Sequence, residues 1–256
     1  MTELVIDGQL WLWLPLVAAL AGFIDAIAGG GGLLTVPALL TAGLPPHMAL
    51  GTNKLAATFG SATAGWTFYR RKLFDPSLWA LAALGTALGA IFGTLMVDWL
   101  RAEWLEKALP VAIFATALYT LFMPRVEDGH HALPRGNRLK LKQGLQGGLL
   151  GTYDGAFGPG TGSFWTVSTL ALYRLDILHA SGLARVMNFI SNGVSLVTFA
   201  VLGHIHWALG LAMGAALMVG AWLGAHSAIH FGGRFIRPVF IAVVIVMAAK
   251  LAWEAW

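Results

Sequence analysis

The chain has 256 residues, of which 57% are hydrophobic and only 11% are charged. Soluble globular proteins have about 45–50% apolar and about 25% charged residues, so this composition excludes an ordinary water-soluble domain and a disordered chain. The net charge of +4 could suggest nucleic acid as a partner, whereas the absence of cysteine rules out disulfides and thiolate metal sites. With a mean hydropathy of +0.72, the chain is expected to have lipid as its main solvent.

The first predicted element is a broken membrane unit. Glu3 and Asp7 precede it without any Lys or Arg, so a cleavable signal peptide, which needs a basic start, is not expected. The apolar sequence Leu10–Gly43 is interrupted at Gly29–Gly32, and the piece after the break, Leu33–Leu40, is shorter than the about 20 residues of a spanning helix. Because lipid cannot satisfy the free backbone groups at such a break, the break is expected to line a cavity enclosed by protein.

Continuous apolar stretches of spanning length follow, and a second broken unit lies among them. The expected spans are, in chain order, Met48–Tyr69, Leu78–Val97, Leu105–Met123, Ala180–Leu202, Trp207–Ile229 and Phe235–Trp253. The second broken unit, Gly144–Tyr173, has its glycine break at Gly158–Gly162 and a short piece, Ser163–Tyr173, after it. The sequence therefore predicts an all-α polytopic membrane protein.

The two broken units belong to an internal repeat. Asp25 of the first unit corresponds to Asp154 of the second, which defines a first offset, and Lys54 corresponds to Arg185 at a slightly longer second offset. Glycine pairs also recur at the second offset, and they are expected to be close-packing positions between helices. These glycines are Gly89 and Gly93 in the first half and Gly220 and Gly224 in the second. An acid, a glycine break, a cation and a glycine pair that recur in one order indicate a duplication.

The basic residues predict how the two halves are oriented. With the N-terminus outside and each broken unit returning to its side of entry, eleven of the sixteen Lys and Arg residues fall inside, as the positive-inside rule requires. The first repeat, 1–123, then starts outside, and the second, 143–256, starts inside after a cytoplasmic linker, 124–142. We therefore predict one transmembrane domain of two inverted-topology repeats, each with a glycine-broken helical hairpin followed by about three transmembrane helices. Both termini are expected outside, and nucleic acid is no longer an expected partner.

Four ionisable side chains remain inside the apolar segments: Asp25, Lys54, Asp154 and Arg185. A charge at bilayer depth costs roughly 2.5–3.5 kcal/mol on insertion scales, so such residues usually face a cavity and pair with one another. Two acids and two bases sum to zero, which suits two compensating pairs. The pairs could serve only to fix the packing of the repeats, or they could belong to a transport site.

The short helices after the glycine breaks favour an anion. Each directs free backbone N–H groups and the positive end of its dipole toward its break. The two buried cations could add positive charge from both halves, and neighbouring hydroxyl and amide side chains could add donors. The predicted anion-binding residues are Gly30, Gly31, Gly32, Thr35, Asn53, Lys54, Gly160, Thr161, Gly162, Ser163, Arg185, Asn188 and Asn192. A nucleotide-binding P-loop is excluded because no Gly-Lys-Ser/Thr follows the glycines.

Several of these motifs are similar to those of a known family. They are GFIDAIAGGGGLLTVP at Gly22–Pro37, ALGTNK at Ala49–Lys54, GPGTG at Gly158–Gly162 and NFISN at Asn188–Asn192. Together they resemble the sulfite exporter TauE/SafE-like family of membrane permeases over essentially the whole chain. The resemblance implies a bacterial-type inner-membrane permease that moves sulfur-containing oxyanions such as sulfite, sulfonates or sulfoacetate, usually outward. Where a Thr-Lys pair is expected in the second half, the chain has Ala184-Arg185, which keeps the charge and loses a hydroxyl.

The leading hypothesis is alternating access, in which the two halves rock around an anion held between the glycine breaks and the two cations. Asp25 and Asp154 could carry protons or neutralise the cations. One alternative is a cation or proton-coupled transporter that uses these acids, and another is an intramembrane aspartyl protease, although no Gly-x-Gly-Asp motif is present. No cofactor or metal is expected, since His226 and His230 lack an evident third ligand. The expected partners are the anion and lipid, and a homodimer is left open.

Overall fold

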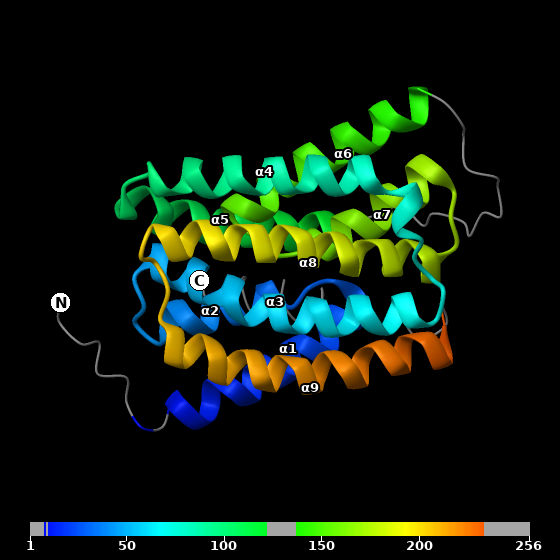
Figure 1. Cartoon of the computed structure of the whole chain (residues 1–256). Coiled ribbons are helices and arrows are strands. Elements are labelled where there is room, and N and C mark those ends of the chain that lie inside the picture. The colour runs from blue at the N-terminus through cyan, green and yellow to red at the C-terminus, as the bar shows by residue number, and fades with distance from the viewer. Residues whose placement is uncertain (1–7, 9, 122–136, 233–256) are drawn as a thin grey trace.

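The structure is a computed structural model that describes residues 8, 10–121 and 137–232. Within these residues the regular structure is helical (Figure 1), which confirms the predicted all-α class. The helices are α1 (Leu10–Ala28), α2 (Gly32–Thr41), α3 (Pro46–Arg70), α4 (Ala80–Asp98), α5 (Ala102–Leu121), α6 (Asn137–Ala156), α7 (Thr161–Tyr173), α8 (Ile177–Val201) and α9 (Trp207–Phe231), with a 3₁₀ helix at Pro76–Leu78. The expected span Phe235–Trp253 lies outside the described residues.

Four of these helices, α1, α4, α8 and α9, are long and apolar enough to cross a membrane by length and composition. The expected spans Met48–Tyr69 and Leu105–Met123 correspond to α3 and α5. Helix α6 begins at Asn137, inside the range expected to be a linker. The helix can begin there because the helix-breaking residues Pro134 and Gly136 precede it and none follows up to Lys142.

Both broken units are interrupted at their glycines, as predicted. The chain leaves α1 through Gly29, whose φ is +85°, and leaves α6 through Gly158 and Gly160, whose φ values are +91° and +77°. Side chains strongly disfavour this left-handed region, so glycine supplies the reversal between each helix pair. The helices after the breaks, α2 and α7, have 10 and 13 residues and are too short to span, as expected.

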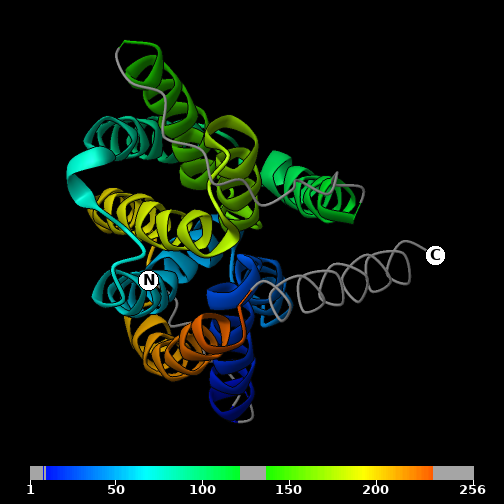
Figure 2. The same ribbon diagram turned by 90° about the vertical axis from the view of Figure 1, so that its right-hand side faces the viewer.

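Helices of the two chain halves interleave in one bundle (Figures 1 and 2). Helix α1 packs against α9 and α6 packs against α4, so each broken unit lies against a long helix of the other half. Helices α3 and α8 pack together in the centre and run antiparallel. Gly51 near the start of α3 contacts the carbonyl of His204 just beyond α8, and Gly182 near the start of α8 contacts the carbonyl of Leu73 just beyond α3.

Glycines allow the closest approaches between these helices. A Cβ atom on either repeated glycine of α4 or of α9 would overlap a backbone carbonyl of the facing helix. The contacts are Gly89 with Gly148, Gly93 with Thr152, Gly220 with Ala19, and Gly224 with Phe23. The predicted close-packing role of these glycines is therefore confirmed. The glycines of α4 and α9 are related by the second offset and their partners by the first, so the offsets that align the two halves of the sequence also relate these contacts.

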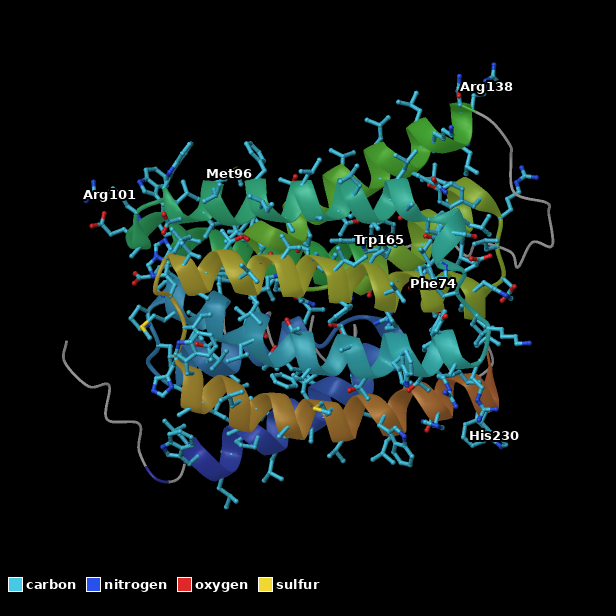
Figure 3. All side chains as sticks on the ribbon, in the orientation of Figure 1. Phe74, Met96, Arg101, Arg138, Trp165 and His230 are labelled. Atoms are coloured by element: carbon cyan, nitrogen blue, oxygen red, sulfur yellow. The ribbon has the colours of Figure 1, made fainter. Side chains whose placement is uncertain are left out.

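The sides of the bundle are apolar and its ends are charged. Helix α4, for example, exposes Leu84, Leu88 and Phe92 on its outer face. Arg101 lies at one end of the bundle and Arg138 at the opposite end (Figure 3). An apolar middle between charged ends is the arrangement that a bundle in a lipid bilayer requires.

Candidate functional site

The two glycine breaks meet in the middle of the bundle. Gly29 packs so closely on the backbone of Gly162 that a Cβ atom there would overlap it. Ser163 Oγ, in the first turn of α7, donates a hydrogen bond to the carbonyl of Ala28, the last residue of α1, over 2.8 Å. Because the breaks touch, the N-terminal ends of α2 and α7 lie close to each other. Several first-turn backbone N–H groups are already used within the breaks: Leu33 N–H donates to the Gly30 carbonyl, and Ser163 N–H donates to the Gly160 carbonyl.

A tight ion pair joins α3 to α6 beside these breaks. Lys54 Nζ lies 2.8 Å from Asp154 Oδ1, and it also donates to the Asp154 carbonyl at 2.5 Å and to Asn192 Oδ1 at 3.2 Å. Asp154 accepts further hydrogen bonds from Thr161 Oγ1 at 3.2 Å and from Ser191 Oγ. Since the two side chains are only 1% and 3% exposed and all three ammonium donors have acceptors, this pair is closed.

A second, looser ion pair joins α8 to α1. Arg185 Nη1 lies 3.6 Å from Asp25 Oδ2 and donates a hydrogen bond to the Asp25 carbonyl. The Asp25 Oδ1 atom accepts from the backbone N–H of Gly31 at 3.0 Å. Arg185 is fully buried, yet its Nε and Nη2 atoms find no hydrogen-bond partner among the residues described. Each acid is thus paired with the base of the other half, and the four charges sum to zero.

A small cavity lies between the breaks and the middle of α3 and α8. Its volume of about 30 Å³ is the room that about one water molecule takes up. Its walls come from the residues Asp25, Gly29, Gly31, Gly32, Thr35, Asn53, Ala57, Asp154, Gly158, Gly162, Asn188, Asn192 and Leu217. The glycine breaks therefore line an enclosed cavity, as their sequence predicts.

The predicted site residues divide into two groups. Those that reach the cavity wall are Gly31, Gly32, Thr35, Asn53, Gly162, Asn188 and Asn192, together with both acids. Those that lie behind the wall are Gly30, Lys54, Gly160, Thr161, Ser163 and Arg185. Of the second group, Gly160 is turned away from the cavity and lies against Thr116 of α5. The two cations therefore face the carboxylates rather than the cavity itself.

Amide groups and a guanidinium converge on the start of α7. A Cβ atom on Gly162 would lie 2.9 Å from Arg185 Nη1 and 2.8 Å from Asn188 Nδ2, so only glycine lets these donors approach the helix end. On the other side of the cavity Thr35 Oγ1 donates to Asn53 Oδ1 over 2.5 Å. Among the described residues, Asn188 Oδ1 has no partner. The cavity is thus surrounded by side-chain and backbone donors as well as by two carboxylates.

Gly29 and Gly158 line the cavity as members of the predicted breaks, although they were not among the predicted anion-binding residues, and three further residues at the site were missing from the sequence prediction altogether. Ser191 donates to Asp154, and its spacing of three from Asn188 on the same helix face could have indicated it. Ala57 lines the cavity and corresponds to Asn188 at the second offset, so the internal repeat also pointed to it. Leu217 of α9 lines the cavity too, but nothing in its apolar sequence context distinguishes it from other leucines.

The histidines in the described part of the chain are not among the residues that line the cavity. His204, in the loop after α8, has its Nε2 atom 2.8 Å from Asp98 Oδ1 at the end of α4, while His206 caps α9 through Nδ1. His226 Nδ1 lies 2.8 Å from the Trp222 carbonyl. Within the part of the chain that is described, no group of three His, Asp or Glu side chains is placed to hold a metal ion.

Comparison with known proteins gives matches over nearly the whole chain. Residues 14–251 match the family model described as sulfite exporter TauE/SafE. The chain is 39% identical over 240 residues to the probable membrane transporter protein YfcA of Escherichia coli (strain K12), covering 93% of this chain and 88% of that protein. It is 40% identical over 241 residues to a probable membrane transporter protein of Haemophilus influenzae, with coverages of 93% and 92%. No solved structure matches it.

Proposed function

Because the chain belongs to the sulfite exporter TauE/SafE family of membrane transporters, we propose that it exports a small sulfur oxyanion, such as sulfite, a sulfonate or sulfoacetate, by alternating access. The family is one of permeases and not of enzymes, so the alternative of an intramembrane aspartyl protease is wrong. The observation that carries the proposal is the enclosed cavity between the two glycine breaks, with a buried cation behind each side. Helix N-termini, amides and cations are the groups that bind oxyanions in proteins.

Packing supports the view that 1–123 and 143–256 are inverted repeats. The contacts of α4 with α6 recur at the repeat offsets in the contacts of α9 with α1. The contact of Gly51 with His204 likewise recurs as that of Gly182 with Leu73, with the second offset added to one partner and subtracted from the other. Two halves with the same packing and opposite orientations can exchange their conformations. One state of the protein then opens to one side of the membrane, and the other state opens to the opposite side. The basic residues favour a cytoplasmic linker at 124–142 and both termini outside a bacterial inner membrane.

The charges of the site explain how binding and movement are coupled in this proposal. The empty site is neutral, so an added anion leaves one negative charge uncompensated in a buried place, which costs several kcal/mol. An anion therefore binds when a carboxylate leaves its cation or takes up a proton. Because the cavity has room for only about one water molecule, the halves must also move apart to admit the substrate.

Export of a monoanion requires no further energy source. An anion that leaves a cell with an interior-negative potential gains about 2.3 kcal/mol per 100 mV, which corresponds to roughly fifty-fold in concentration. The acids are then needed to keep the two cations compensated while the site is empty. The gain applies to an anion that moves without a proton, because a proton exported with it cancels the charge that is moved.

One observation favours a second candidate, a cation or proton-coupled transporter. Asp25 and Asp154 line the cavity, whereas Lys54 and Arg185 lie behind its wall. In that case the carboxylates would bind the transported cation, and the bases would hold the acids in their ionised form.

Transport into and out of proteoliposomes separates the two candidates. Purified full-length protein would be tested with sulfite, thiosulfate, sulfoacetate, acetate as a carboxylate control, and sodium. The variants are Lys54→Ala, Arg185→Ala and Asp25→Asn, and Lys140→Ala in the exposed first turns of α6 serves as a matched control. Loss of sulfur-anion transport in the first two variants supports the proposal when both variants reconstitute as folded protein and the control keeps its activity. Intact anion transport in both Lys54→Ala and Arg185→Ala excludes it, and sodium transport that Asp25→Asn abolishes supports the second candidate.

A further inference from the structure

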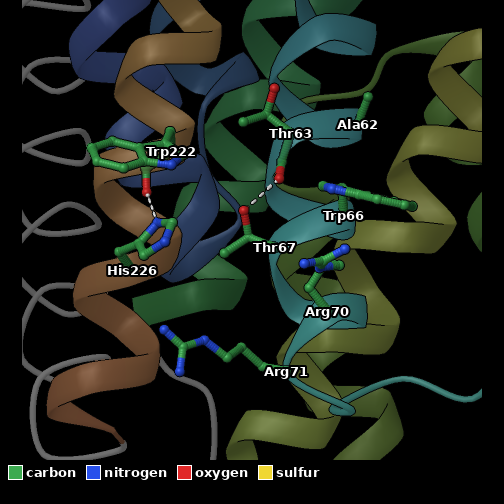
Figure 4. Close-up of a pocket in the computed structure, with 8 residues that line it drawn as sticks. All are labelled: Ala62, Thr63, Trp66, Thr67, Arg70, Arg71, Trp222 and His226. Carbon is green, nitrogen blue, oxygen red and sulfur yellow. Dashed lines mark hydrogen bonds between the residues drawn. The ribbon is translucent and has the colours of Figure 1, made fainter.

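A second hollow lies apart from the central cavity, between α3 and α9 at the end of the bundle where α3 terminates (Figure 4). This α3–α9 groove has a volume of about 720 Å³ and is lined along its length by Thr63, Trp66, Arg71, Trp222 and His226, among others. It is far larger than the central cavity and open on the outer side of the bundle. The transport proposal makes no use of it.

Basic side chains gather at one end of the groove. Arg71 reaches from α3 toward α9, below His226 (Figure 4). Arg70 lies with its guanidinium 6.0 Å from the centre of the Trp66 ring, a distance at which a cation and an aromatic face attract each other. Within residues 10–121 and 137–232, neither arginine is paired with a carboxylate. The positive charge at this end of the groove is therefore not neutralised by carboxylates of the described residues.

The rest of the groove is apolar despite its threonines. Thr63 Oγ1 donates to the Phe59 carbonyl and Thr67 Oγ1 to the Thr63 carbonyl, each over 2.8 Å, so both hydroxyls are satisfied by their own helix. Trp66 and Trp222, which are 61% and 52% exposed, are among the residues that line the groove. A basic end next to an apolar channel flanked by tryptophan is the combination found where membrane proteins meet the lipid headgroup layer.

The repeat-related position of the other half shows that the fold does not require these residues. At the second offset, Arg70 and Arg71 correspond to Val201 and Leu202, and His226 corresponds to Leu95. The basic end is thus particular to the α3–α9 side, while its counterpart between α8 and α4 is apolar. A cluster that only followed from the packing of the repeats would recur in both places.

We propose that the α3–α9 groove binds an anionic phospholipid. Its phosphate lies between Arg70, Arg71 and His226, and an acyl chain lies along the channel between Trp66 and Trp222. Charge complementarity selects an anionic headgroup, and the apolar channel selects a lipid over a free phosphate ion or the transported anion. The proposal is independent of which substrate the central cavity carries.

Native mass spectrometry and thermal unfolding of the full-length protein in detergent test the proposal. The probes are phosphatidylglycerol, phosphatidylcholine and inorganic phosphate. The variants are Arg70→Gln with Arg71→Gln, which removes the charge, and Thr63→Phe, which fills the channel and keeps the charge. Arg138→Gln with Lys140→Gln, at the exposed start of α6, removes the same charge elsewhere.

The expected result is a preference for phosphatidylglycerol over phosphatidylcholine that weakens about thirty-fold in the arginine pair variant. Each of the two arginines near an anionic lipid surface is expected to account for about half of the corresponding binding free energy. Thr63→Phe also loses the preference, and the α6 control keeps it. Equal losses in the arginine pair and in the α6 control would show that only overall charge matters, and would overturn the proposal. A second result would also overturn the proposal: phosphatidylglycerol and phosphatidylcholine bind alike, while inorganic phosphate stabilises the protein and the arginine pair variant abolishes that stabilisation. The groove would then hold a free anion. Retained preference in Thr63→Phe would overturn the acyl-chain part.

Discussion

The two ion pairs at the centre of the molecule are related by the repeat offsets of the sequence but differ in how tightly they are closed. Lys54 has three acceptors, and Asp154 is held by Lys54, Thr161 and Ser191, with both charged side chains almost completely buried. Arg185 is equally buried but holds its acid, Asp25, at 3.6 Å, and that acid is 19% exposed. The Lys54–Asp154 pair is therefore a closed structural contact, whereas Arg185 of the other pair has donor atoms without partners among the described residues.

For the proposed anion transport, this difference distinguishes the two cations. The Nε and Nη2 atoms of Arg185 lack partners in the described structure, and a buried donor without a partner costs about 1–3 kcal/mol. An oxyanion that accepts from these atoms would recover that cost, and the planar guanidinium suits it better than an ammonium group. For the proposed transport, this difference favours Arg185 as the cation that the substrate reaches once the halves move apart, while Lys54 mainly keeps α3 and α6 together.

The largest expected effect breaks the closed pair. Lys54→Met leaves Asp154 buried without its cation, and we expect the free energy of unfolding to fall by about 3–5 kcal/mol. Arg185→Met should cost less, because Asp25 is already partly exposed and can be hydrated. The measurement is denaturant unfolding of the purified variants in detergent.

A double variant controls for the loss of packing at the closed pair. Lys54→Met combined with Asp154→Leu removes both charges, and we expect it to recover more than half of the stability lost in Lys54→Met alone. Equal losses in Lys54→Met and Arg185→Met would contradict the difference in closure between the pairs.

The second prediction compares glycines with the same backbone conformation. Gly29 and Gly43 have φ values of +85° and +86°, but a Cβ on Gly29 would overlap the backbone of Gly162, whereas one on Gly43 would meet nothing within 4 Å. Gly43→Ala should therefore cost only the conformational penalty of about 1–2 kcal/mol. Gly29→Ala should cost about 1–3 kcal/mol more, because the two breaks must separate. Similar melting temperatures for the two variants would show that the breaks are not in tight contact.

The third prediction sharpens the difference between the two cations. Asp25→Asn removes the carboxylate that competes with the substrate for Arg185, so we expect sulfite or sulfoacetate to bind about tenfold more tightly near neutral pH. Asp154→Asn should give no such gain, because Lys54 is enclosed by other groups. Ligand-induced thermal stabilisation measures both, since it rises with the ratio of ligand concentration to Kd. Tighter binding in Asp154→Asn alone would mean that Lys54 is the receiving cation.

Much of this site could be predicted because its signals are local. Four glycines in a row, an acid before them and a lone cation in an apolar stretch each contrast with their neighbours in the sequence, and the internal repeat doubles the evidence. The breaks, the short helices and the glycine packing of α4 and α9 could be predicted for this reason.

The pairing could not be predicted, since it is a property of the tertiary structure. Nothing in the sequence shows that Lys54 pairs with the acid of the other half, because that pairing depends on how α3 meets α6. The unequal closure depends on Ser191 and Asn192, whose positions on α8 matter only once Asp154 lies against that helix. The α3–α9 groove could not be predicted for the same reason, because its arginines and His226 come from different halves. In the sequence the arginines indicate only the orientation of the chain, and His226 is only a metal-ligand candidate without a third ligand.

The smallest expected effect concerns the start of the two central helices. Helix α8 begins after Asp176, whose carboxylate accepts from the backbone N–H groups of Leu178 and His179, whereas α3 begins after Pro45, the repeat-related residue, without a side-chain cap. Burial by itself would raise the pKa of Asp176, but hydrogen bonds from His179 and Leu178, together with the electrostatic attraction of His179, prevail and hold that pKa below its usual value. We expect Asp176→Ala to lower the free energy of unfolding by about 1 kcal/mol at neutral pH.

The pH dependence of that cost tests its origin. A carboxylate whose pKa is lowered in the folded state stabilises the protein fully above the unfolded pKa of about 3.9, and this contribution disappears as the pH falls through the lower folded value. The difference in melting temperature between the wild type and Asp176→Ala should therefore shrink in buffer more acidic than the unfolded pKa of about 3.9. The matched control is Pro45→Ala at the start of α3, whose effect should not change with pH because no carboxylate caps that helix. A difference for Asp176→Ala that persists unchanged in acid would mean that the side chain acts through packing and not through its charge.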